Sequence, residues 1–265
     1  MKKVAKYLEV FKVTLLTPLA YIWDVLARQA FLIVIMYVFV QLWSTTYSWE
    51  GSSTIAGFTM PQMIWYLVLS ESMVMGMSRT SADIDTEVKS GSLAYSLTKP
   101  YDYALFHYSR YMGDSILRFC TSLLIAGAVA YLTVGSPSFS LQSVAAGLAA
   151  VLLGFTMDFF IQFALGLTAF WVEDTWAFRF LYSRVTMLLG GMMLPLDVFP
   201  EWLRGIASSL PVASIVYGPV RTFVRFNVQE WTALLARQSI WIVVLCVMAK
   251  SVYGMGVKRV NVQGG

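Results

Sequence analysis

Two carboxylic acids, Glu71 and Asp158, stand within or beside long apolar stretches of this sequence. A charged carboxylate is costly in hydrocarbon, so an acid in such a place marks a proton or ion pathway, or is protonated or hydrogen-bonded and structural. Both interpretations stay open for both residues. A catalytic pair would require the two acids to converge, and nothing in the spacing indicates that they do.

Other reactive side chains are sparse. His107 is the single histidine, and the two cysteines, Cys120 and Cys246, lie in apolar runs, so neither a zinc-site spacing nor a disulfide framework is present. No Gly-Lys dipeptide occurs, so the chain carries no phosphate-binding loop. We therefore expect no catalytic residue, no metal and no cofactor in this chain.

Methionines recur at helical spacing in residues 61–78 and form one stripe with a tyrosine and a serine. Methionine adapts to varied apolar partners, so such a stripe suits the lining of a pathway for an amphipathic cargo. Ordinary packing against another helix is the alternative. The candidate lining residues are Met63, Tyr66, Ser70, Glu71, Met73 and Met77, together with Met187, Gly190 and Gly191 of a second methionine-rich stretch.

The polar segment after this stretch is typical of a short surface helix. Ser81 could cap its start, and Asp83, Asp85 and Glu87 follow in the first turns, where the helix dipole favours acids. Gly91 would end it. A short capped helix outside the apolar spans suits the docking of a soluble partner, with a solvated connector as the alternative.

The elements that position these residues follow from composition. The chain has 265 residues, of which 58% are hydrophobic and 13% charged, with a mean hydropathy of +0.66. Soluble domains carry about 25% charged residues, so a water-soluble enzyme is excluded. We expect an all-α integral membrane protein that forms a single domain over residues 1–265.

Apolar runs of about 20 residues cross a bilayer as helices, and the chain divides into six such runs. Residues 4–24 alternate apolar and charged positions at helical spacing, which predicts an amphipathic interfacial helix within 1–25. Residues 197–230 hold three prolines and are too broken to span, which favours short helices dipping into one leaflet. The six predicted spans are 29–46, 61–78, 114–134, 141–171, 178–196 and 232–253.

Basic residues divide unequally between the two sides of this arrangement. Fifteen of the 19 lysines and arginines fall on the side of the N-terminus, the 79–113 loop and the C-terminus, and four on the side of 197–230. Because basic loops stay in the cytoplasm, both termini and the 79–113 loop are predicted to be cytoplasmic.

Several stretches resemble a known family. They include LTPLAYIWDVL (16–26), DIDTEVKSGSLAYSLTKPYD (83–102) and RVTMLLGGMMLPLDVFPEWLRGIASSLP (184–211), with the most specific patterns at 90–100 and 190–200. In these the chain resembles the small six-span ABC-2-type exporter permeases related to daunorubicin-type drug exporters.

The resemblance implies that two permeases, identical or related, pair with two copies of a separate ATPase that binds ATP and Mg²⁺. It implies an exporter in the plasma (inner) membrane of a prokaryote that moves an amphipathic or hydrophobic cargo by alternating access. It also implies an outer re-entrant hairpin at 197–230 and a pathway between paired permeases along spans two and five. An ion-coupled carrier or channel that uses Glu71 or Asp158 is the alternative. The ATPase-coupling residues would be Asp83, Asp85, Glu87, Ser90, Gly91, Leu93 and Leu97.

Overall fold

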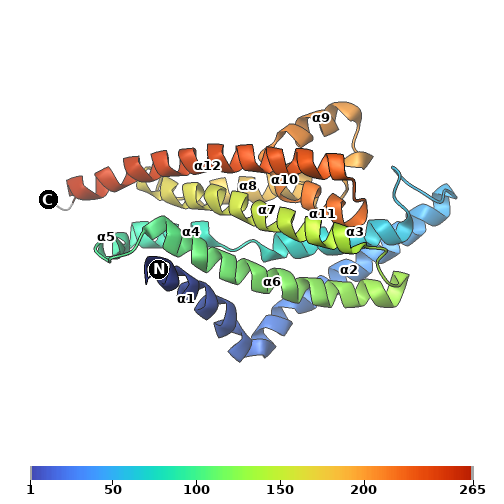
Figure 1. Cartoon of the computed structure of the whole chain (residues 1–265), viewed down its shortest axis with the longest axis horizontal. Helices are drawn as coiled ribbons and strands as arrows, with labels where there is room; N and C mark the ends of the chain where they lie inside the picture. The colour runs from blue at the N-terminus through green and yellow to red at the C-terminus, as the bar shows by residue number, and fades with distance from the viewer. Residues whose placement is uncertain (1, 264–265) are drawn as a thin grey trace.

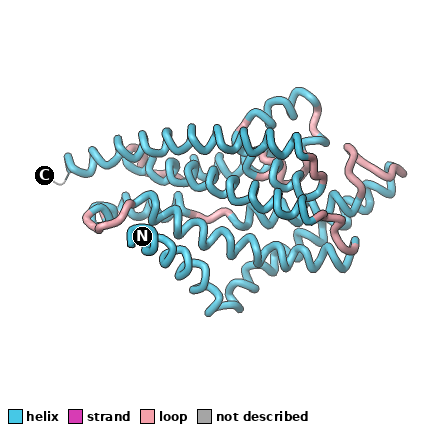
Figure 2. The backbone as a smooth tube through the Cα atoms, in the orientation of Figure 1, coloured by secondary structure: helices cyan, strands magenta, loops and turns pink. Residues whose placement is uncertain are grey.

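The computed structural model describes residues 2–263, and every regular element in that part of the chain is a helix (Figure 1). Most loops lie toward the two ends of the bundle, and residues 77–79 make a further break in its middle, as the tube in Figure 2 shows. In chain order the elements are α1 (Lys2–Leu16), η1 (Thr17–Tyr21), α2 (Ile22–Glu50), α3 (Met60–Gly76), α4 (Thr80–Lys89), α5 (Ser92–Leu97), α6 (Tyr103–Val134), α7 (Leu141–Leu167), η2 (Thr168–Phe170), α8 (Trp176–Leu189), η3 (Leu196–Val198), α9 (Glu201–Ser209), α10 (Pro211–Ile215), α11 (Tyr217–Val224) and α12 (Val228–Gln263).

The bundle has two distinct ends. Both ends of the described chain lie at one of them together with α4 and α5, and we call it the terminal end (Figure 1). The opposite end carries α9, α10 and the turn at 135–140, and we call it the far end. Because both ends of the described chain lie at the terminal end, the arrangement agrees with an even number of crossings of the bundle.

Among the described residues four helices are long and apolar enough to cross a membrane. The predicted second and fifth spans correspond to α3 and α8, which have only 17 and 14 residues. At 1.5 Å per residue these are about 26 Å and about 21 Å long, short of a hydrocarbon core of about 30 Å. Six spans therefore stay a prediction. The four candidate spans are Gln29–Glu50, Tyr103–Val134, Leu141–Phe170 and Val228–Lys258.

The structure corrects two predicted boundaries. The third span was expected from residue 114, yet α6 begins at Tyr103, because Asp102 accepts a hydrogen bond from the Leu105 N–H at 2.8 Å and caps the helix there. Residues 103–113 of the expected 79–113 loop are therefore helix. The fifth span was expected to reach residue 196, but α8 ends at Leu189, where Gly191 turns the chain with a φ of +77°.

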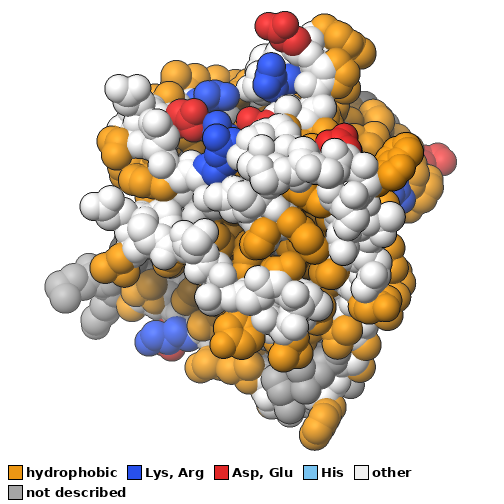
Figure 3. All heavy atoms as spheres, turned by 90° about the vertical axis from the view of Figure 1, so that its right-hand side faces the viewer, with side chains coloured by type: hydrophobic (Ala, Val, Ile, Leu, Met, Phe, Trp, Pro, Cys, Tyr) orange, Lys and Arg blue, Asp and Glu red, His pale blue; other side chains and the backbone are white. Residues whose placement is uncertain are grey.

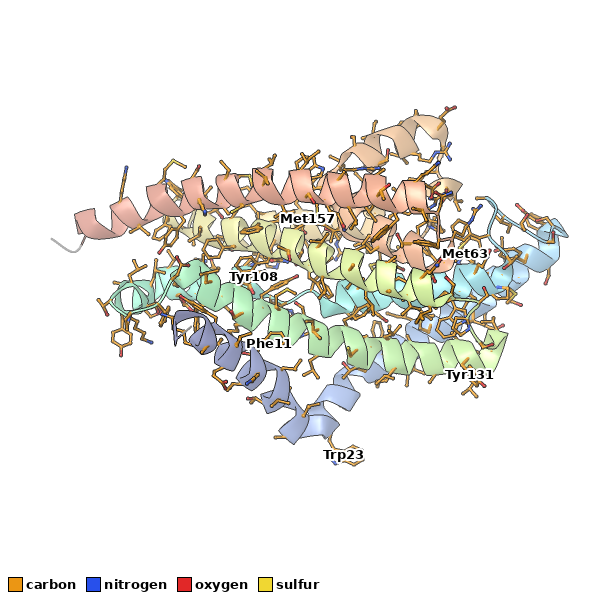
Figure 4. All side chains as sticks on the ribbon, in the orientation of Figure 1. Phe11, Trp23, Met63, Tyr108, Tyr131 and Met157 are labelled. Atoms are coloured by element: carbon orange, nitrogen blue, oxygen red, sulfur yellow. The ribbon has the colours of Figure 1, made fainter. Side chains whose placement is uncertain are left out.

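The amphipathic N-terminal helix is present as α1, and the chain changes to a 3₁₀ turn at Thr17, next to Pro18. Phe11 and Leu15 lie half-buried beside Gly113 of α6. Leu8 is exposed instead of packed, and the side chain of Val4 lies outside the described residues. In Figure 4 Trp23, which is 80% exposed, points away from the bundle at the elbow between α1 and α2.

The core of the bundle is α3, whose residues from Met63 to Met73 are all buried. The helices α2, α6 and α11 pack around it, and α7 lies behind it. Thr59 caps α3 through a capping box with Gln62, and Pro61 occupies its first turn. The short helices of the 197–230 segment are α9, α10 and α11, of which α11 is buried against α7 through Val220 and Phe223.

Candidate functional site

The expected docking helix is divided into α4 and α5, and α4 is attached tightly to the bundle. One face of α4, with Ser81 and Ile84, packs on α7 at Gly166, where a Cβ would lie 2.7 Å from Ile84 Cβ. Ser81 does not cap the helix as expected. Its hydroxyl donates to Gln162 Oε1 of α7 at 2.5 Å, and Arg79 holds the cap position. The close contact fixes α4 to the terminal end of α7.

The three acids of α4 bind residues of the same chain. Asp85 accepts hydrogen bonds from Thr175 at 2.8 Å and from Lys89 at 2.9 Å, and its carboxylate lies 3.6 Å from Arg179. Burial alone would raise the pKa of Asp85, but these hydrogen bonds and positive charges outweigh it and leave the pKa below its usual value. Asp85 thereby joins α4 to the start of α8.

Glu87 and Asp83 anchor α4 to α6. The Tyr103 hydroxyl donates to Glu87 at 2.8 Å, and His107 Nε2 lies 3.5 Å from the same oxygen. Burial raises the pKa of Glu87, but His107, Tyr103 and the charge of Arg110 together hold the pKa below its usual value. Asp83 forms a more exposed ion pair with Arg110 at 3.3 Å. The acids therefore fasten α4 to the bundle instead of facing outward.

The outward-facing part of this region is the turn between α4 and α5 and the first residues of α5. Ser90 and Gly91 are exposed, and Gly91 has a φ of +72°, which allows the sharp turn between the two helices. Leu93 is buried and Leu97 half-buried, so these two hold α5 in place. Tyr95 is 68% exposed, which sequence reasoning missed. We call Ser90, Gly91, Ser92 and Tyr95 the docking tip.

The predicted pathway residues on α3 are in the middle of the bundle. Met63, Tyr66, Ser70, Glu71 and Met73 are buried and Met77 is half-buried. Figure 4 shows Met63 enclosed by neighbouring helices toward the far end. The described single chain leaves these side chains in contact with its own residues, so their role in a pathway stays a prediction.

Two hydrogen bonds bring α3 and the end of α8 together. The Tyr66 hydroxyl donates to the carbonyl of Gly191 at 2.5 Å, and Ser70 Oγ donates to the carbonyl of Met192 at 2.7 Å. Gly190 is buried, and Met187 is half-buried one turn earlier on α8. The two methionine-rich stretches are therefore joined, as the sequence suggested, but through polar groups.

The two acids of the apolar stretches, Glu71 and Asp158, have different surroundings. Asp158 of α7 accepts hydrogen bonds from the Tyr111 hydroxyl of α6 and the Tyr182 hydroxyl of α8, each at 2.5 Å. These tyrosines were missed because they are 47 and 24 residues away in sequence. Glu71 is 1% exposed, and its Oε2 has no hydrogen-bond partner among the described residues. Both carboxylate oxygens of Asp158 thus have hydrogen-bond partners, whereas one oxygen of Glu71 has none in the described part of the chain.

One helix remains weakly packed. Large side chains along α8 face outward, and only Thr186 of this helix is fully buried. Trp176 stacks on Phe180 at 5.0 Å, and the Arg184 guanidinium lies 4.7 Å from the Phe180 ring. Its polar contacts with the rest of the chain are at Arg179 and Tyr182, and at Gly191 just beyond its end, while Leu189 packs against the apolar cluster of Leu196, Ala207 and Ala213.

Comparison with known proteins identifies the chain by family alone. The profile of the ABC-2 family transporter proteins matches residues 31–264, which is nearly the whole sequence. No curated protein matches it significantly. An all-helical bundle with four candidate membrane spans and a polar helix at the terminal end is what a transporter subunit of this kind requires. The chain belongs to the ABC-2 family of transporter proteins, whose members are membrane permeases.

Proposed function

We propose that this chain is the permease subunit of an ATP-driven exporter, in which two permeases pair and two copies of a separate ATPase bind at their terminal ends. The observation that carries the proposal is the docking tip, an exposed turn held rigidly on the bundle. A rigid exposed tip can transmit a push from a soluble partner, whereas a flexible connector cannot. The chain itself requires no cofactor in this proposal, because ATP and Mg²⁺ belong to the ATPase.

The fastening of α4 supplies a route for that push. Movement of the tip displaces α4 as a unit, because Ser81 and Ile84 hold it to α7 and Asp85 holds it to Arg179. Arg179 begins α8, so force on the tip reaches the predicted fifth span directly. In the proposed mechanism ATP binding closes the ATPase pair, and α8 then moves to open the pathway outward.

The proposed topology has six spans, with both termini in the cytoplasm of a prokaryotic cell at its plasma membrane. The short length of α3 is compatible with six spans, because α3 is enclosed by other helices and need not be as long as the hydrocarbon core is thick. The charge distribution supports the orientation, since 15 of the 19 basic residues belong to the proposed cytoplasmic side. Residues 197–230 would then form the outer re-entrant segment.

The proposed pathway lies where two permeases meet and carries an amphipathic or hydrophobic cargo. The outward-facing α8 would form one wall of it. Residues Tyr66 and Ser70 of α3 lie behind the end of α8 and become accessible when the bonds to Gly191 and Met192 open. Alternating access in this arrangement is the displacement of α8 from α3.

The test is binding between the full-length permease and the ATPase that co-purifies with it. Tyr95→Ala at the docking tip should weaken binding at least about tenfold, because exposed aromatic anchors carry much of the energy of an interface. Tyr131→Ala is the matched control, since Tyr131 is an equally exposed tyrosine at the far end of α6 (Figure 4). Equal binding by both variants would refute docking at the tip.

An ion-coupled carrier is the second candidate, and one observation favours it. Glu71 is buried with an unpartnered oxygen, which is the environment of a group that exchanges a proton. Asp158 offers no such support, because two tyrosines already satisfy it.

A further inference from the structure

The far end contains a cavity that the export mechanism does not use. It has a volume of about 570 Å³ and lies between α9, α11 and α12. That volume is in the range of small-molecule sites, about 300–1,000 Å³. In the end-on view of Figure 3, several basic and acidic side chains gather in the upper half of this face. Apolar groups, including Leu196, Trp231 and Leu234, complete the lining.

The cavity carries an excess of positive charge. Arg204, Arg221, Arg225 and Arg237 line it, against the two carboxylates of Glu201 and Glu230. Of the four, only Arg221 is neutralised, by ion pairs with Asp197 and Glu230. The other three have no carboxylate partner among the described residues. These four arginines are also the basic residues that the sequence assigned to the side opposite the termini.

The three unpaired arginines face the cavity from different elements. Arg204 belongs to α9, and its exposed guanidinium makes no hydrogen bond within the described part of the chain. Arg225 lies over the Phe58 ring at 5.2 Å, and Arg237 donates to the carbonyl of Ser208 at 3.3 Å. Arg237 stands nine residues into α12, which is about 14 Å along the helix axis. An arginine near the end of a membrane span needs a polar partner, which an anion or water can supply.

Buried polar atoms in the cavity wall are also unsatisfied. Ser214 is 1% exposed and its Oγ has no partner among the described residues. Gln238 lies behind it and donates to the Ser214 carbonyl at 2.9 Å, while its own Oε1 has no partner in the described part of the chain. Buried polar groups in proteins are nearly always satisfied, so these two unpartnered atoms mark the wall as a place for a polar ligand or an ordered water.

An apolar stripe continues from the cavity along α12. Ile240, Val244 and Val247 follow Arg237 at steps of three, four and three residues and are all exposed. These steps keep the three side chains on the same face of the helix as Arg237. The surface therefore presents a cationic pocket followed by an apolar track, which matches a molecule with an anionic head and an apolar tail.

We propose that this cavity binds the phosphate head group of an amphiphile, with its tail along Ile240, Val244 and Val247. Planar guanidinium groups bind carboxylate and phosphate oxygens bidentately, and a phosphate offers more acceptor oxygens than a carboxylate, so several arginines around one cavity suit a phosphate head group. Binding requires neither ATP nor the ATPase. The site and the proposed export function can therefore fail independently of each other.

The test uses the full-length chain in dodecyl maltoside with fluorescent phosphatidylglycerol as the probe. We expect dodecyl phosphate to displace the probe at about tenfold lower concentration than dodecyldimethylamine oxide, which has the same tail without a phosphate, because a charge-assisted contact is worth about that factor. Equal potency of the two competitors would overturn the proposal. Inorganic phosphate should compete far more weakly than dodecyl phosphate, and equal competition would refute the role of the apolar stripe.

Variants locate the site. Arg204→Gln should weaken probe binding about tenfold without affecting the fold, since Arg204 has no partner in the described part of the chain to lose. Gly205→Leu should also weaken binding, because a Cβ at Gly205 meets no atom within 4 Å and the side chain fills the cavity. Arg184→Gln is the matched control, an exposed arginine outside the cavity. Wild-type binding by Arg204→Gln, or equal losses in all three variants, would refute the assignment.

A further measurement distinguishes two sources of the phosphate group, a resident phospholipid and an exported cargo. A resident phospholipid should co-purify with the wild-type chain from its native host and be depleted in Arg204→Gln, as measured by mass spectrometry of extracted lipids. An exported phosphate-bearing cargo should instead be absent after extraction, while the labelled probe moves across proteoliposomes only with ATP. If no phospholipid co-purifies and no probe is transported, the proposal is contradicted.

Discussion

The ion pair at Asp85 is the point where the docking helix is coupled to α8, and Asp85→Asn tests it. Asparagine can still accept the hydrogen bond from Thr175, but it loses the charge that faces Lys89 at 2.9 Å and Arg179 at 3.6 Å. The Asp85 side chain is only 9% exposed, so solvent screens these interactions little. Hydrogen bonds to charged groups contribute about 1.5–3 kcal/mol.

That loss should leave the fold intact, since domains are stable by about 5–15 kcal/mol. It should act instead on coupling. A loss of at least about 1.4 kcal/mol lowers the equilibrium constant for attachment of α4 to α8 about tenfold. We therefore expect stimulation of the ATPase by the permease to fall several-fold, with membrane insertion unchanged.

The assay is ATP hydrolysis by the reconstituted complex, with hydrogen exchange of α4 and α8 as the structural readout. Asp83→Asn is the matched control on the same helix. Asp83 and Arg110 are 44% and 48% exposed, and exposed pairs contribute only about 0–1 kcal/mol. Asp83→Asn should therefore behave nearly as the wild type. Equal behaviour of the two variants would refute a coupling route through Asp85.

Three other predictions concern Glu71, the topology and acid pH. In transport assays of the reconstituted complex, Glu71→Gln should keep most activity and Glu71→Leu should lose more; equal inactivity of both would favour the ion-coupled carrier. In a background without native cysteines, Ser208→Cys should react with an impermeant thiol reagent added outside and Ser90→Cys should not, and the reverse pattern would overturn the orientation. Because the pKa values of Asp85 and Glu87 are lowered, their contribution to stability is present above the unfolded pKa and is lost as pH falls through the folded value. Hydrogen exchange in α4 should therefore stay slow until pH drops below the usual range for carboxylates; acceleration already at mildly acidic pH would contradict the network.

Spans defined by uninterrupted apolar runs were predictable from sequence. The expected fourth span, 141–171, coincides with the observed candidate Leu141–Phe170, because nothing but hydrophobicity and a serine cap at its start decides it. The start of α6 was placed too late because its charged residues were read as loop. Within residues 103–113, Arg110 in fact pairs with Asp83 of α4 at 3.3 Å, and His107 is buried beside Glu87, so the helix accommodates both side chains.

The candidate site was predictable in its location but not in its contacts. Helical spacing placed Asp83, Asp85 and Glu87 together on a polar helix, and the structure confirms the helix. Their partners lie far away in sequence, as Thr175 does at 90 residues from Asp85, and no local pattern indicates such pairs. Spacing also indicated one methionine stripe on α3, whereas burial of every side of that helix depends on four neighbouring helices.

The attachments of α8 also determine how it can move. Its contacts at Arg179, Tyr182 and the carbonyl of Gly191 are ion pairs and hydrogen bonds, which depend on direction and distance. A helix held by close packing of apolar side chains can shift by small steps, but a small shift of α8 would weaken all three contacts together. In the proposed six-span topology, little water surrounds Tyr182 and Gly191 to replace these bonds. The displacement of α8 that we propose would then be a concerted step between discrete positions, with a barrier set by the simultaneous loss of the polar contacts.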